Sequence, residues 1–375
     1  MNEKKLASQL TFFILTIKEQ RGREMKRNYG LDVARILAIF FVIMAHVYTD
    51  TYDLSNLGLH NIPVNKIWFG YLGFTLGRLG VPIFLMLTGY FLLSRKWTST
   101  KISRFFHKNF IHLLITWEIW LFLYFMYSKY YLEQKIGGGT YLRQALFVEK
   151  VQLPNAWYMP LILGIYLFLP YVAIALEQIN DKYLLLIMAI LYGYLFLVPT
   201  INQFAALSHH IILENQLELS YGGGYCAFYI LIGYCINRFS LQFKTLIQKV
   251  SGTLVALLLL SITVLFQVVC YRAGKNYNVW YDFATLPLIS AIIFIFFEKW
   301  QLHVKNNILT KISDCSFGIF LIHYPILTVI TTTVIHYQQS FIFLLGLTII
   351  VYLISLLIVF VINRYQKIGT LLFFK

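Results

Sequence analysis

Three residues near the start of the chain combine side chains suited to chemistry with an unusual setting. Asp32, Arg35 and His46 lie in an otherwise apolar stretch. On a helix with about 100° per residue, Arg35 and His46 point within about 20° of each other and lie roughly 16 Å apart along the axis. Asp32 precedes Arg35 by one turn and can pair with it. The spacing predicts one helix face with a cation at one end and an imidazole deeper in.

These side chains suit proton transfer and anion binding. An imidazole, with an ordinary pKa of about 6.5, takes and returns a proton near neutral pH. A guanidinium binds phosphate groups or orients a carbonyl oxygen. The structural alternative is that Arg35 extends to the membrane surface, that His46 bonds a carbonyl in the core, and that Asp32 is a charge at a helix start.

The composition places these residues in a membrane. Of the 375 residues, 59% are hydrophobic, 18% are aromatic and 13% are charged. The charged share is about half that of a soluble domain, which excludes soluble α/β, disordered and coiled-coil proteins. Charged groups inside a membrane cost about 2.5–3.5 kcal/mol each to insert, so they are the first candidates for function.

The apolar runs predict an all-α polytopic membrane protein, a bundle of about ten transmembrane helices. Each run is long enough for a bilayer about 30 Å thick, and too long and too uniformly apolar for a barrel strand. The expected spans are 31–49, 67–93, 106–127, 157–176, 183–199, 222–238, 250–271, 281–298, 312–335 and 341–363. Three consecutive glycines in the longest loop, 128–156, predict a flexible connector.

The basic residues indicate the orientation. Both tails and the loops on their side hold 22 of the 31 lysines and arginines, whereas the opposite loops hold 7. The positive-inside rule therefore predicts that both termini are cytoplasmic. Because topology explains most of the net charge of +15, we expect the lipid bilayer as a partner and no nucleic acid.

No metal site is expected. The four cysteines are scattered through apolar runs and suit packing better than a disulfide or zinc site. The pair His209–His210 with Glu214 resembles the spacing of metal ligands, but the sequence offers no further strong ligand beside them. A solvated outer loop is therefore the preferred interpretation.

The first 24 residues are expected to be an extension. Their apolar stretch, 6–17, is too short to span a membrane, and Met25 precedes the first span by a few residues. One hypothesis is that Met25 is the initiator, and the other is that 1–24 is an extension lying on the membrane surface. The membrane-embedded domain is then 25–375.

Four segments resemble the acyltransferase 3 family of integral-membrane O-acyltransferases. They are 31–46 (LDVARILAIFFVIMAH), 81–90 (VPIFLMLTGY), 156–170 (AWYMPLILGIYLFLP) and 316–323 (SFGIFLIH), in the family's order. Thr88 stands where the family usually has serine, and the basic stretch around Arg104 lacks the usual proline. We find no appended esterase-like domain.

The resemblance implies transfer of an acetyl or similar acyl group from acetyl-CoA to a hydroxyl of a surface polysaccharide or its polyprenyl-linked precursor. It also implies a multi-pass protein of a bacterial plasma membrane. The alternative is an exporter of the polysaccharide or its lipid-linked unit. We expect His46 to be the base, Arg35 to bind or orient the acyl donor, Asp32 to hold Arg35, and Arg104 to contact the CoA.

Further residues are candidates for acceptor binding. Arg78, expected at membrane depth, suits an acceptor phosphate, or forms a buried ion pair with Glu118 or another acid. Glu118 lies in the third apolar run and needs a partner for the same reason. By resemblance, Trp157 and Tyr158 stack on a sugar, although an aromatic belt explains them equally well. His323, in a late apolar run, is either an acceptor contact or a structural residue.

Overall fold

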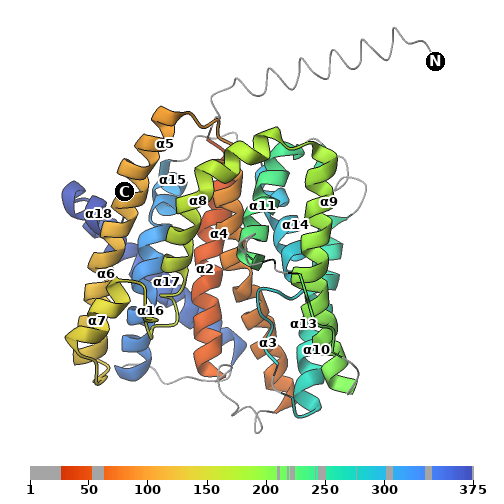
Figure 1. Cartoon of the computed structure of the whole chain (residues 1–375). Helices are drawn as coiled ribbons and strands as arrows, with labels where there is room; N and C mark the ends of the chain where they lie inside the picture. Colours follow the sequence, from red (N-terminus) through yellow and green to blue (C-terminus); the bar gives the residue numbers. More distant parts are fainter. Residues whose placement is uncertain are drawn as a thin grey trace.

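The structure is a bundle of long helices (Figure 1). It is a computed structural model and describes residues 27–52, 63–208, 212–217, 219, 224–240, 242–243, 251–275, 277–300, 307–333 and 340–373. All regular elements in these residues are helical. The predicted N-terminal extension, 1–24, and the histidine pair His209–His210 lie outside the described residues.

Within the described residues, eight helical stretches are long and apolar enough to cross a membrane: Tyr29–Thr51, Lys66–Leu93, Ser99–Tyr130, Tyr158–Gln178, Asp181–Leu207, Gly252–Arg272, Ser316–Thr333 and Phe341–Ile362. The other two predicted spans correspond to α11 (Gly224–Arg238) and α14 (Thr285–Lys299). The all-helical, polytopic prediction is confirmed, whereas the count of ten remains a prediction.

The elements follow in the order α2 (Tyr29–Thr51), α3 (Val64–Arg78), α4 (Gly80–Thr88), η2 (Gly89–Leu93), α5 (Ser99–Phe105), η3 (Phe106–Phe110), α6 (Ile111–Tyr130), α7 (Gly138–Ala145), α8 (Tyr158–Gln178), α9 (Asp181–Tyr192), η4 (Gly193–Leu197), α10 (Val198–Ser208), α11, α13 (Gly252–Arg272), α14, α15 (Asn307–Asp314), α16 (Ser316–Thr333), α17 (Phe341–Ile362) and α18 (Gln366–Phe373). The three η elements are π-helical turns, a form common near functional sites.

Helix α2 is at the centre of the bundle. It packs against α3, α4, α14, α15, α16 and α17, so the helix that carries the first candidate residues is surrounded by the rest of the fold (Figure 1). The proximal end of the bundle is where α2 begins and where α5 and α15 lie; the distal end is where α2 ends and where α7 lies. The predicted orientation makes the proximal end cytoplasmic.

Glycines allow α11 to approach α4 and η2 closely. A Cβ at Gly89 would lie 1.8 Å from the carbonyl oxygen of Ile230 in α11, and a Cβ at Gly233 would lie 2.0 Å from that of Met86 in α4. The two glycines thus face each other's helix across one crossing. Small residues at such contacts are the usual means of packing helices in membranes.

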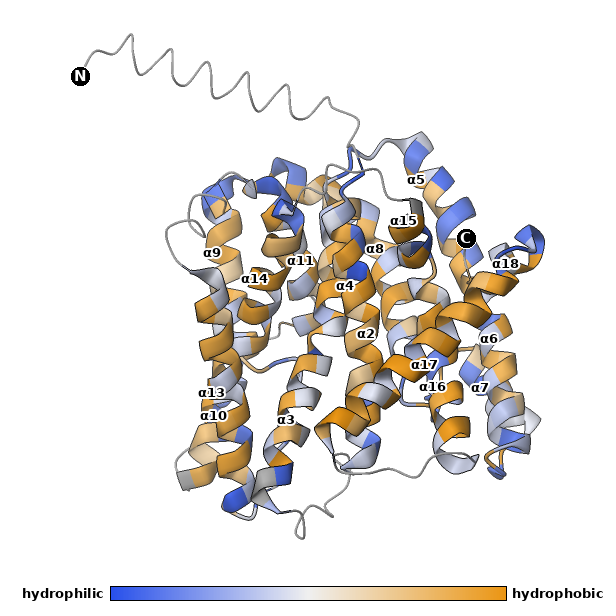
Figure 2. Cartoon of the chain, turned by 180° about the vertical axis from the view of Figure 1, so that it is seen from behind, coloured by the Kyte–Doolittle hydropathy of each residue, from blue (hydrophilic) through white to orange (hydrophobic). Residues whose placement is uncertain are grey.

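The helices are coloured mostly as hydrophobic along their length (Figure 2). Large hydrophobic side chains remain exposed along α13 and α17, among them Leu254, Leu258, Leu353 and Leu357. An apolar exterior of this extent suits contact with lipid. All four cysteines are buried and free, which agrees with the predicted packing role.

Two predicted elements differ in the structure. The glycine-rich connector is partly ordered, because Gly138 begins α7 and this helix packs against α6. Helix α14 begins at Thr285 rather than near residue 281. Pro287 has no N–H to bond the carbonyl four residues earlier, which favours a helix that begins within the preceding turn.

Candidate active site

Asp32 lies in a polar cluster at the proximal end. Arg27 donates to its carboxylate twice, from Nε to Oδ2 at 2.8 Å and from Nη2 to Oδ1 at 3.1 Å. The hydroxyl of Ser313 donates to Oδ1 at 2.8 Å. The hydrogen bond with Asp32 raises the pKa of the Arg27 guanidinium, which remains charged. Asp32 is therefore a tightly held carboxylate that joins α2 to the residues before it and to α15.

Arg35 joins this cluster indirectly. Its Nη1 donates to the Ser313 hydroxyl at 3.2 Å, whereas the nearest oxygen of Asp32 is 3.7 Å away. The guanidinium is enclosed by protein yet 30% of the side chain stays accessible. The pairing of Asp32 with Arg35 is thus present as a weak contact, with Ser313 as the main connection.

His46 lies farther along α2, against α16. Its ring centroid is 5.3 Å from that of His323 and 5.3 Å from that of Tyr324. His46 keeps part of its surface accessible although protein surrounds it on all sides. His46 is therefore partly accessible rather than sealed in a closed core.

The sequence of α16 explains how His323 is held. Pro325 cannot donate to the carbonyl of Leu321, so that oxygen accepts a hydrogen bond of 2.5 Å from the Tyr124 hydroxyl instead. The Asn155 amide donates to the Tyr124 hydroxyl at 3.1 Å and to the carbonyl of Phe320 at 3.3 Å. These bonds fix the turn of α16 beside His323 to α6 and to the segment before α8.

Arg78 ends α3 and is flanked by aromatic rings. Its guanidinium carbon lies 4.5 Å from the ring centroid of Phe74, 4.3 Å from that of Trp280 and 5.0 Å from that of Tyr281. Nη1 donates to the Tyr281 hydroxyl at 3.3 Å, and the buried Nε has no hydrogen-bond partner among the described residues. None of the ion pairs in this part of the chain involves Arg78 or Glu118, so the alternative of a buried ion pair is not found there.

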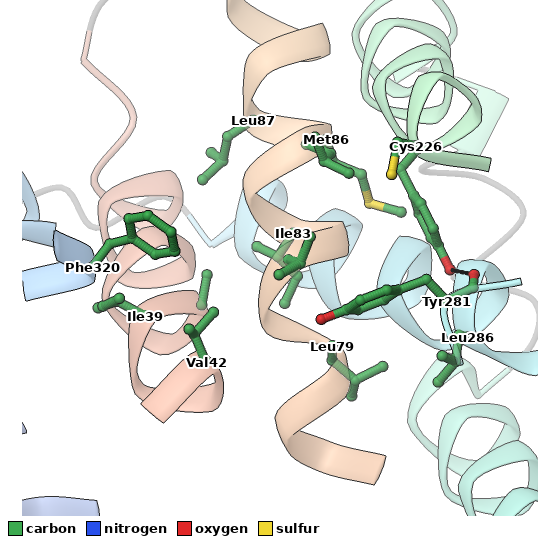
Figure 3. Close-up of a cluster of buried hydrophobic side chains, with 14 of the residues drawn as sticks. Ile39, Val42, Leu79, Ile83, Met86, Leu87, Cys226, Tyr281, Leu286 and Phe320 are labelled. Atoms are coloured by element: carbon green, nitrogen blue, oxygen red, sulfur yellow. Dashed lines mark hydrogen bonds between the residues drawn. The ribbon is translucent and has the colours of Figure 1, made fainter. Parts of the chain in front are cut away.

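The segment 277–284 folds into the bundle and brings two of these rings. Its backbone groups bond side chains from other helices: the N–H of Val279 donates to Gln267, and the N–H of Ala284 donates to Thr200. The carbonyl of Tyr281 accepts from the Tyr229 hydroxyl at 2.7 Å. Figure 3 shows the Tyr281 ring extending to α4 beside Leu79 and Ile83. Irregular backbone at such depth is tolerated where it is buried or borders a cavity.

Trp157 and Tyr158 belong to the same cluster. The Trp157 ring lies 5.7 Å from that of Tyr281, and the Tyr158 ring lies 5.2 Å from that of Phe320. The structure therefore brings together five of the predicted residues: His46, Arg78, Trp157, Tyr158 and His323.

Two side chains lie between this cluster and Arg35. Tyr166, on α8, forms a hydrogen bond with Thr88 and lies near Arg35. Tyr166, Thr88 and Tyr158 each keep accessible surface, although protein encloses both tyrosines. Partly accessible polar groups thus extend from Arg35 towards His46.

Arg104 and Glu118 are not part of either cluster. Arg104 is exposed on α5, at the proximal end of the bundle (Figure 1). Glu118 is partly exposed on α6. No group of three or more metal-ligating residues occurs in the described part of the chain. Both His209 and His210 fall outside that part.

Several residues of the site were missed. Arg27, Ser313, Trp280 and Tyr281 each contact a predicted residue, and Tyr166 lies near Arg35. Tyrosine is frequent in this chain, with 27 copies, so residue type alone gave no signal. Asp314 and Ser313, polar residues just before an apolar run, were the clearest available sign of a partner for Arg35.

Comparison with known proteins gives one result. A family model described as an acyltransferase domain matches residues 28–363, which is most of the chain. No curated protein and no solved structure matches. The match begins one residue after Arg27 and includes all residues of both clusters except Arg27 itself.

Proposed function

The chain belongs to the acyltransferase 3 family and is a multi-pass membrane acyltransferase, and from this premise we propose its donor and acceptor. It transfers an acetyl or similar acyl group from acetyl-CoA to a hydroxyl of a surface polysaccharide or of its polyprenyl-linked precursor. The membrane is the plasma membrane of a bacterium.

One observation supports this most directly. Arg35 and His46 lie on one helix, at two depths, and both are partly accessible, with Tyr166 and Thr88 near Arg35. A CoA thioester is long, with phosphates at one end and the reactive carbonyl at the other. A cation near the cytoplasmic end and a proton-accepting imidazole deeper in the bundle match those two ends.

Arg35 holds the phosphates of the donor, and the exposed Arg104 provides a second cation at the same end. Ser313 and Asp32 orient Arg35. The pantetheine arm then passes Tyr166 towards His46, while the acceptor enters from the distal side and contacts Arg78, Trp157 and Tyr158. Their rings and guanidinium suit a sugar face and an oxygen-rich group.

The chemistry needs one proton carrier. His46 takes the proton of the acceptor hydroxyl as its oxygen bonds to the acyl carbon. The carbon–sulfur bond then breaks, and His46 returns the proton to the departing thiolate. The products are the ester and free CoA, and no acyl group needs to be attached to the protein.

The test uses purified protein in liposomes with acetyl-CoA labelled in the acetyl group. The acceptor is the host polysaccharide after mild alkali has removed its esters. We expect labelled polysaccharide from the wild type, and a loss of at least about 100-fold with His46→Ala. His107→Ala is the matched control, because His107 is an exposed histidine on η3 and belongs to neither cluster.

Normal labelling by the His46→Ala variant would reject His46 as the base. Transport of polysaccharide across the membrane without any labelled ester would reject the enzymatic proposal in favour of an exporter.

A further inference from the structure

His323 has an unusual pair of ring nitrogens. Its Nδ1 lies 2.7 Å from the carbonyl oxygen of Phe320 and 3.1 Å from that of Ile319, and the residue has 0% exposure. A carbonyl oxygen only accepts hydrogen bonds, so Nδ1 carries the hydrogen. A second proton would place a charge in a fully enclosed site, so the ring is neutral. Nε2 is then a hydrogen-bond acceptor.

This acceptor has no donor. Nε2 of His323 is buried and has no hydrogen-bond partner among the described residues. His46 lies beside it, but the two rings are tilted by 37° and no hydrogen bond joins them. Buried polar groups without partners are unfavourable and uncommon in native proteins, which points to a donor from outside the chain.

Arg78 has the opposite unpaired group, a hydrogen-bond donor rather than an acceptor. Its buried Nε is a hydrogen-bond donor without an acceptor. The charge of Arg78 acts on His46, and the rings of His323 and Tyr324 each lie 5.3 Å from the His46 ring. A phosphodiester or a carboxylate would satisfy Arg78 but has no hydrogen for His323. A molecule with hydroxyl groups offers both a hydrogen to accept and an oxygen to donate to.

We propose that His323 binds the acyl acceptor, by accepting at Nε2 a hydrogen bond from a hydroxyl of a polyhydroxylated molecule that lies against His46. Arg78 donates through Nε to an oxygen of the same molecule. This rests on the proposed function and adds to it the polarity of the acceptor site. His323 holds the acceptor, while His46 remains the base.

Two substitutions distinguish the role of Nδ1 of His323 from the role of Nε2. The amide of asparagine reaches about as far as Nδ1, so His323→Asn keeps a donor for the Phe320 carbonyl and loses the acceptor at Nε2. The amide oxygen of glutamine reaches about as far as Nε2, so His323→Gln keeps an acceptor there.

The liposome assay is run with both variants at saturating acetyl-CoA while the de-esterified polysaccharide is varied. We expect kcat/KM for the polysaccharide to fall roughly 100-fold with His323→Asn and less than about tenfold with His323→Gln, because an unpaired buried group discriminates strongly. KM for acetyl-CoA stays unchanged in both. Wild-type kinetics in His323→Asn, or equal losses in both variants, would overturn the inference.

A second measurement does not depend on turnover. Nitrogen NMR of histidine-labelled protein in lipid bilayers, with His323→Gln to identify the signals, should show hydrogen on Nδ1 and a bare Nε2 whose signal shifts when the polysaccharide is added. Hydrogen on Nε2, or no shift with polysaccharide, would overturn the inference. If His46→Ala abolishes transfer while His323→Asn does not, the inference fails and the proposed function stands.

Discussion

Arg35 and Asp32 are joined through the hydroxyl of Ser313, which accepts a hydrogen bond from the arginine and donates one to the carboxylate. The direct contact between them, at 3.7 Å, is too long for a strong hydrogen bond. Asp32 is also bonded twice by Arg27, which itself reaches Asp314 at 3.0 Å. The position of Arg35 therefore depends on α15 as well as on its own helix.

This relationship predicts the effect of removing one hydroxyl. Ser313→Ala should raise KM for acetyl-CoA about three- to tenfold with little change in kcat, because Arg35 loses its orienting bond but keeps its charge. Ser313→Thr keeps a hydroxyl and should remain close to wild type. Steady-state kinetics in liposomes measure both. A change in KM for the polysaccharide instead of the donor would contradict the assignment of Arg35 to the donor end.

The close crossing of α4 and η2 with α11 predicts that adding one methyl group at Gly89 lowers the stability of the protein. Gly89→Ala places a Cβ against the backbone of Ile230, which cannot yield as a flexible side chain does. We expect destabilisation by about 1–3 kcal/mol and a lower midpoint of thermal unfolding in detergent.

Gly164→Ala is the matched control for this variant. It lies within α8, and a Cβ there would meet nothing within 4 Å. Because alanine is the better helix former by about 0.5–1 kcal/mol, Gly164→Ala should unfold at the same temperature as the wild type or higher. Equal unfolding midpoints for the two variants would show that the close crossing is not needed for stability.

The aromatic rings around Arg78 predict that its shape matters as well as its charge. A planar guanidinium packs between Phe74, Trp280 and Tyr281, and a lysine ammonium does not. Arg78→Lys should therefore raise KM for the polysaccharide at least about tenfold without changing KM for acetyl-CoA. A fully active Arg78→Lys variant would show that a point charge is sufficient at this position.

Much of the fold follows from the sequence for a simple physical reason. A bilayer requires backbone groups to be bonded within each segment, so long apolar runs specify helices without knowledge of tertiary contacts. The helix bounds differ from the predicted ones where a local preference of the chain acts against the pattern of apolar runs. Pro287 favours the late start of α14 at Thr285, and Gly138 begins a helix because α7 can pack on α6.

The site was predictable only in part. Arg35, His46 and Arg78 are conspicuous because charge and imidazole are costly at membrane depth. Their partners are not conspicuous. Tyr281 reaches Arg78 because a loop folds inwards and bonds Gln267 and Tyr229, and no local pattern encodes that long-range contact.

The orientation of the bundle can be tested with two introduced cysteines. All four native cysteines are buried, so a membrane-impermeant maleimide should label them little. Lys96 lies between η2 and α5, and Lys135 lies between α6 and α7. Both are exposed, and they lie beyond opposite ends of the continuous helical stretch Ser99–Tyr130. The positive-inside rule predicts that Lys135→Cys is labelled in intact cells and Lys96→Cys only after the membrane is opened. The reverse pattern would place His46 towards the cytoplasmic side of α2, and the donor and acceptor would then have to exchange their ends of the site.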